Sequence, residues 1–557
     1  MIRASMTARP NARDDTTRYL CAAAQLDSKF ADDAIREFLV EPTRPVPPSP
    51  GTDTTAVLGE AIAARTRRKY RDSALLALAV VVLFTAPVDV LLGWLVLGLL
   101  ASLPQWLSRR KLLASKTKVN PAVMLAGGVA VAVLVVVGPQ LFEYLSDSTS
   151  TSRSSRSRSA AAEESTGALV AAIVMIAGML AVLLTDRLIV WRHLTTRFNR
   201  LSPPVADPLT SERPVLTAST GFLHELHRVA ATERGQAARE GAPLIVYRGY
   251  SPFVGAGFEY RPWSMAVPLQ PIKDKQQAEL TTDLLYGSIR EALAGLGRAT
   301  PLTPGRRLGD LRITDQVIVP AGELVDHLAD PATRTILADL DEPPYPVMGP
   351  ENVAHLRATP EEWARYYLCF QVETWDRDLV VSVFVHVAMD ETTMYVEWTP
   401  CVLLPIKDEY QDIDRLPPGP LRPVLNAVAR LVRLPATILQ STAHTFSTIR
   451  PAPRRPGMVD PEMYGSLRSL REMAADDGVR NYFQLVDVER YLKILNSRFV
   501  LAVSKLLRDS GYSAAGFEQQ AVTVNNRNVH IGGSVYGDFQ QGDNSTFNSP
   551  DKPGEEK

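Results

Sequence analysis

The sequence predicts an α+β protein, in which a four-helix transmembrane block is joined to a large cytoplasmic α+β domain that contains an antiparallel meander. Three observations predict this fold class. Long apolar runs occupy the stretch from Ser73 to Trp191, clusters of arginine and lysine flank those runs, and β-branched residues dominate the stretch from Tyr366 to Leu404. About 20 apolar residues cross a bilayer as a helix, whereas short β-branched segments between polar turns are typical of strands.

The first apolar run, Ser73 to Leu107, is longer than one crossing requires, and Pro87 and Asp89 interrupt it. It therefore predicts two short helices joined by a turn. Each of the two later runs approaches the length of a single crossing. The four expected helices are Leu75 to Ala86, Val90 to Leu103, Pro121 to Leu141 and Ala168 to Leu184.

Three basic clusters orient this block: Arg65 to Lys69, Arg109 to Lys118 and Arg187 to Arg200. Short loops rich in arginine and lysine stay in the cytoplasm, so two crossings must separate each cluster from the next. The sequence therefore predicts a multi-pass protein of the cell membrane with both termini in the cytoplasm.

The 557 residues divide by composition into five parts. A net charge of -1 gives no indication of a nucleic-acid partner, and the three cysteines, Cys21, Cys369 and Cys401, lack metal-type spacing. No motif indicates a cofactor. The expected parts are an N-terminal cytoplasmic helical cap (1–72), a transmembrane domain of four helices (73–191), a linker (192–214), a cytoplasmic α+β domain (215–520) and a Gly/Asn-rich C-terminal tail (521–557).

One loop of the α+β domain is a candidate ligand site. Two glycines separated by a single alanine allow backbone amides to approach a phosphate closely. The third glycine and the following helix of a dinucleotide site are absent. A plain turn between two strands is the competing interpretation. The candidate residues are Arg248, Gly255, Gly257, Glu259 and Arg261.

A second candidate lies in the basic segment Arg415 to Val459, where apolar residues recur at helical spacing. Arg422, Arg430 and Arg433 border that apolar face. Such a segment suits anionic headgroups at a membrane surface. A helix that packs on the core, with its arginines in solvent, is the alternative.

Four stretches are familiar as a set: T-T-R-Y-L-C-A-A-A from Thr16, P-P-S-P-G-T-D from Pro47, Y-R-G-Y-S-P-F-V-G-A-G from Tyr247 and Y-L-C-F-Q-V-E-T-W from Tyr367. With them the chain resembles a family of uncharacterised actinobacterial multi-pass membrane proteins. The excess of arginine over lysine is compatible with that source. The resemblance implies no activity, cofactor or active site.

Three functions follow as hypotheses, and whether the protein is an enzyme stays open. The first is a membrane-anchored cytoplasmic binding or scaffolding module, with the lipid bilayer, a protein bound through the domain or the tail, and a second copy of the chain as candidate partners. The second is an enzyme with a small pocket at the 248–261 loop, which convergence of Arg248, Glu259, His386 and Glu397 would favour. The third is a membrane effector or pore controlled by the cytoplasmic domain, which a solvent-lined helix interface would favour.

Overall fold

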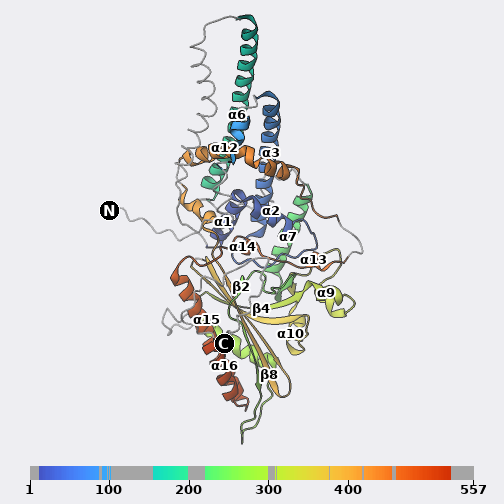
Figure 1. The fold of residues 1–557 in the computed structure, drawn as a ribbon. Helices are drawn as coiled ribbons and strands as arrows, with labels where there is room; N and C mark the ends of the chain where they lie inside the picture. The colour runs from blue at the N-terminus through green and yellow to red at the C-terminus, as the bar shows by residue number, and fades with distance from the viewer. Residues whose placement is uncertain are drawn as a thin grey trace, which may run out of the picture.

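An eight-stranded mixed sheet forms the centre of the α+β domain (Figure 1). The computed structural model describes residues 12–86, 91–96, 98–99, 101, 155–198, 220–298, 308, 310–375, 377–416, 419–453 and 459–527. The strand order is β2-β8-β7-β6-β4-β1-β5, and β3 also pairs with β8. The strands are β1 (Ala242–Tyr247), β2 (Phe258–Glu259), β3 (Trp263–Pro268), β4 (Leu311–Pro320), β5 (Val347–Met348), β6 (Arg365–Thr374), β7 (Leu379–Met389) and β8 (Thr393–Leu403).

The predicted antiparallel meander is present as β6, β7 and β8. Val383 in the middle strand lies opposite Phe370 on one side and Pro400 on the other. Both faces of β7 are buried, which explains why valines occupy alternate and adjacent positions alike. The whole sheet is mixed, because β1 runs parallel to β4.

Helices cover one face of this sheet: α8 (Thr282–Arg298), α15 (Tyr482–Asp509) and α16 (Ala515–Arg527). The apolar side chains of α8 recur every four residues, at Leu285, Ile289 and Leu293, and all three are fully buried. Since α16 runs on to Arg527, the first seven residues of the expected tail belong to a helix. The tail from residue 528 lies outside the described residues.

The 250–257 loop, which contains the two candidate glycines, covers the opposite face of the sheet. The ring of Phe253 packs 4.4 Å from that of Phe384 and 5.4 Å from that of Tyr367. Gly255 and Gly257 have φ values of +96° and +90°, and a Cβ at either position would lie within 2.2 Å of a backbone carbonyl oxygen. Both glycines are therefore required by the fold of this loop.

We expect Gly257→Ala to lower the free energy of unfolding by about 2–4 kcal/mol, because it adds left-handed backbone strain to a steric overlap with Val402. Gly287→Ala is the matched control. Gly287 lies inside α8 with nothing within 4 Å of its added Cβ, so alanine there should be neutral or stabilise the protein by up to about 1 kcal/mol. Chemical denaturation of both variants measures the difference, and equal stabilities would contradict the argument.

A second core lies between the sheet and the long apolar helix. It is built by α1 (Ala12–Leu26), α2 (Ser28–Phe38), α3 (Thr54–Thr85) and α7 (Thr220–Ala238). Asp27 caps α2 and Asp53 caps α3, each accepting a backbone N–H. The end of α6 (Ser155–Arg197) contributes Val190 and Leu194 to the same core.

The predicted four-helix transmembrane block is contradicted, and the described residues give no support for the multi-pass arrangement. Among the described residues, only Val170–Arg197 of α6 has the length and composition of a membrane span. The expected helix Leu75 to Ala86 is instead the end of α3, one helix with the basic cluster, so its apolar part is too short to cross. The expected helix Pro121 to Leu141 lies outside the described residues.

One further helix, α12 (Leu421–Phe446), lies across α3 and α6 (Figure 1). Trp94, in the helical residues 91–96, donates its indole N–H to the carbonyl oxygen of Leu431 at 3.2 Å. The remaining short helices are α9 (Ala321–Asp326), η3 (Pro331–Thr335), α10 (Pro350–Ala358), α11 (Asp408–Gln411), η4 (Asp412–Arg415), α13 (Pro461–Tyr464) and α14 (Leu470–Met473).

Candidate functional site

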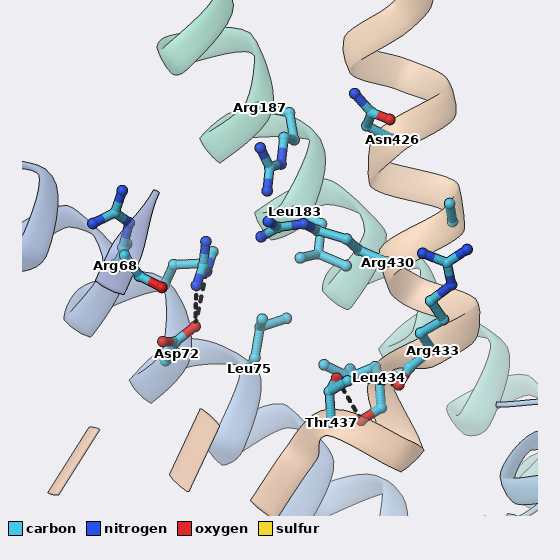
Figure 2. A pocket seen from close by; sticks show the side chains of 13 residues that line it. Arg68, Asp72, Leu75, Leu183, Arg187, Asn426, Arg430, Arg433, Leu434 and Thr437 are labelled. Carbon is cyan, nitrogen blue, oxygen red and sulfur yellow. Dashed lines mark hydrogen bonds and ion pairs between the residues drawn. The ribbon is translucent and has the colours of Figure 1, made fainter. Parts of the chain in front are cut away.

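Three helices that are far apart in the sequence, α3, α6 and α12, border a half-open cavity of about 700 Å³. We call it the arginine pocket (Figure 2). Its volume is in the range of small-molecule sites. The lining residues are Ser28, Arg68, Arg71, Asp72, Leu75, Leu183, Arg187, Asn426, Ala429, Arg430, Arg433, Leu434 and Thr437.

Apolar side chains hold the three helices together on one side of the pocket. Leu75 of α3, Leu183 of α6 and Leu434 of α12 are at most 4% exposed, and they belong to one cluster with Val82 and Met179. The interface between these described helices is therefore closed by apolar contacts. The hypothesis of a pore is not tested by these contacts, because residues 102–154 lie outside the described residues.

The acidic residues near the pocket are already engaged. Asp186 accepts from Arg67 at 2.9 Å and from Arg71 at 3.2 Å, and Asp72 pairs with Arg71 at 2.7 Å. Both carboxylates are buried. Two arginines of α3 thus neutralise the negative charge at this junction.

The other arginines of the pocket lack a carboxylate partner. Arg68 is 4% exposed and donates to the carbonyl oxygens of Ala24 and Gln25, while its Nη1 has no partner. Within the described part of the chain, Arg187, Arg430 and Arg433 form no ion pair, and Nε of Arg187 is buried without an acceptor. A buried N–H donor without a protein acceptor is costly, so these groups are available to hydrogen-bond an ion or water.

Arg187 and Arg430 come from different helices and reach toward the same space (Figure 2). Arg430 is exposed, so a bound ion can contact it. Surrounding protein atoms, together with repulsion from Arg71, lower the pKa of Arg430 to about 10. Desolvation and repulsion from Arg67 lower the pKa of Arg68 to the same value. Both guanidinium groups therefore keep their charge at neutral pH, and the lining of the pocket is positively charged.

Two of the three arginines predicted to touch a membrane surface, Arg430 and Arg433, lie in this pocket. Arg422 is exposed on the same helix and does not line it. Sequence reasoning missed Arg68, Arg71 and Arg187 as site residues, because it treated the basic clusters only as signals of orientation. Their positions at the ends of apolar runs were the feature of the sequence that could have identified them as site residues.

The candidate ligand loop has its polar groups occupied by the protein itself. The amides of Gly255 and Gly257 donate to Oε1 of Glu472 at 2.8 and 2.9 Å, and burial raises the pKa of this carboxyl group. The close backbone approach that suggested a phosphate cradle therefore serves an internal carboxylate from α14.

The two arginines of that loop also have internal partners, and its glutamate is partly buried. Arg248 pairs with Glu37 of α2 and donates to the carbonyl oxygen of Gly465 at 3.0 Å. Arg261 pairs with Glu489 at 3.0 Å. Glu259 lies opposite Cys401 in the sheet, and burial raises its pKa. The five predicted loop residues thus lie in four different surroundings: the two glycines share Glu472, and the other three residues each have different neighbours.

The four residues whose convergence would favour an enzyme are not brought together. His386 faces Glu397 across β7 and β8, and its Nδ1 lies 2.9 Å from the carbonyl oxygen of Tyr366. Glu259 lies opposite Cys401, which is four residues from Glu397 along β8, a separation of about 13 Å. Arg248 binds Glu37. In addition, no group of three or more His, Cys, Asp or Glu among the described residues is arranged to hold a metal ion.

We expect Arg248→Ala to lower the free energy of unfolding by about 1.5–3 kcal/mol, because Glu37 is 7% exposed and would lose a charged partner. Arg415→Ala is the control, since the Arg415–Asp412 pair is exposed and worth less than about 1 kcal/mol. Thermal unfolding measures both. An unchanged melting temperature for Arg248→Ala would return this residue to the list of ligand-binding candidates.

Comparison with known proteins gives one family. A family model described as an AbeC-like domain matches residues 262–540, half of the chain. The matched part begins at β3 and includes α12, whereas α3 and α6 precede it. The match bears neither on the source of the protein nor on the number of membrane crossings. No curated protein and no solved structure matches the chain.

Proposed function

We propose that this chain, which belongs to the AbeC-like domain family, is a membrane-anchored binding module. Its ligand occupies the arginine pocket. The observation that carries the proposal is the excess of unpaired guanidinium groups where α3, α6 and α12 meet. The family name supplies no substrate. The ligand class therefore comes from the pocket, and the anchoring comes from the surface of α6.

The surface of α6 supports membrane anchoring. Only 22% of the apolar window in Val170–Arg197 is buried within the protein, whereas the core helix of a globular domain is mostly buried. Val170, Ile173 and Val174 are more than half exposed, as is Phe84 at the end of α3. Side chains of this kind gathered on one part of the molecule indicate contact with lipid or with another apolar surface.

Charge supports a cytoplasmic position for the α+β domain. Arg65, Arg67 and Arg71 directly precede the apolar part of α3, and Arg187 directly follows the apolar run of α6. Arginine-rich ends of membrane helices stay on the cytoplasmic side. The N-terminal helices pack at the same end, so they share that side in this proposal.

The anchor is tested by substituting exposed apolar residues of α6. Because Ile173 and Val174 point away from the fold, replacing both with aspartate should leave folding intact and cost about 3 kcal/mol per residue in membrane insertion. Wild-type protein should stay with membranes after an alkaline carbonate wash, and the double variant should be released. Val522→Asp, also at an exposed valine, is the control and should stay. Release of the wild-type protein would refute anchoring.

Sidedness is tested by one introduced cysteine. The three native cysteines are buried and form no disulfide with one another, whereas Tyr250 in the α+β domain is 89% exposed. Tyr250→Cys should react with a membrane-impermeant maleimide only after cells are permeabilised. Equal labelling of intact cells would place the domain outside.

A further inference from the structure

The arginine pocket has two chemically different sides. Arg187 and Arg430 project into it, whereas Leu75, Leu183 and Leu434 form an apolar side. The leucines continue into the cluster of Val82 and Met179, which follows α3 and α6 toward the apolar segment. A ligand that fills the pocket would therefore present a charged end to the arginines and an apolar end to the leucines.

The pocket also lies at a particular level along α6. The apolar run of this helix ends between Leu183 and Arg187, and both residues line the pocket. In a bilayer, the headgroup region begins where the hydrocarbon core of about 30 Å ends. A helix anchored as proposed above would hold the pocket at the depth of lipid phosphates.

The donors match phosphate. A guanidinium group binds phosphate oxygens through two parallel N–H donors. Arg187, Arg430 and Arg433 carry three positive charges, which is more than a ligand with a single carboxylate would neutralise. None of the 13 lining residues is aromatic, so a nucleotide base has no ring to stack on. The volume of about 700 Å³ is far larger than a single phosphate ion requires.

We propose that the arginine pocket binds a phosphate group that belongs to the headgroup of an anionic membrane lipid, with the glycerol and first acyl carbons against Leu75, Leu183 and Leu434. This inference rests on the proposed function, since a lipid reaches the pocket only if α6 lies in a bilayer. A free phosphate compound shares the charge chemistry but leaves the apolar side unfilled.

Variants of two arginines isolate the pocket. Arg187 and Arg430 form no ion pair with described residues, so glutamine at both positions should leave the ligand-free melting temperature unchanged. Arg422→Gln is the matched control, because Arg422 carries the same charge on the same helix but lies outside the pocket. Loss of binding in the double variant alone therefore reports on the pocket and not on the net charge.

The experiment uses the full-length protein in dodecyl maltoside and follows its melting temperature during titration with dioctanoyl phosphatidic acid, dioctanoyl phosphatidylcholine or pyrophosphate. Phosphatidic acid should stabilise the wild type and Arg422→Gln. Each substitution in the pocket should weaken the apparent affinity about fivefold, and the pair about 25-fold. Phosphatidylcholine should have little effect, because its headgroup has no net charge.

Three results would overturn the inference. An unchanged response in the double variant would place the lipid elsewhere. Pyrophosphate that stabilises as strongly as phosphatidic acid would identify a soluble ligand and leave the binding module in place. If neither compound stabilises a protein that resists carbonate extraction, the pocket is not a phosphate site although the anchor holds. Release by carbonate would refute the anchoring itself.

Discussion

Buried guanidinium groups need acceptors, and this requirement determines how the N-terminal helices meet the rest of the protein. Arg18 pairs with Asp414, and Arg248 pairs with Glu37. The fully buried Arg471 donates to the backbone carbonyl oxygens of Pro50 and Arg377, which belong to the N-terminal region and to the α+β domain. Removing one partner from such a pair leaves a charge without compensation in a poorly solvated place. These contacts therefore hold the two cores in one arrangement.

Helix α3 links the helical core to α6. Its first half fills the helical core with Val57, Leu58 and Ile62, and its apolar end lies beside α6. The basic residues between these halves point to different sides of α3, because successive residues of a helix are rotated about its axis. Arg67 and Arg71 meet Asp186, whereas Arg68 meets carbonyl oxygens of α1. One basic cluster thus supplies both ion pairs and part of the lining of the arginine pocket.

Much of the α+β domain could be predicted from local pattern. The meander followed from β-branched residues separated by polar turns, because strand pairing between neighbours in sequence needs no long-range information. The parallel pairing of β1 with β4 could not be predicted in this way, since it joins segments about 70 residues apart. The membrane block failed for a different reason. Window hydropathy does not register that the apolar end of α3 continues a charged helix.

The candidate sites divide along the same line. Composition alone identified Arg430 and Arg433 as unusual, because arginines on an apolar helix without neighbouring acids are visible in the sequence. It also identified Gly255 and Gly257 as conformationally special. Only the tertiary structure decided that the glycine amides face Glu472 and that Arg430 meets Arg187 across a cavity. Charge and backbone freedom are properties of single residues, whereas the identity of a partner depends on which distant segments the fold brings within a few ångströms.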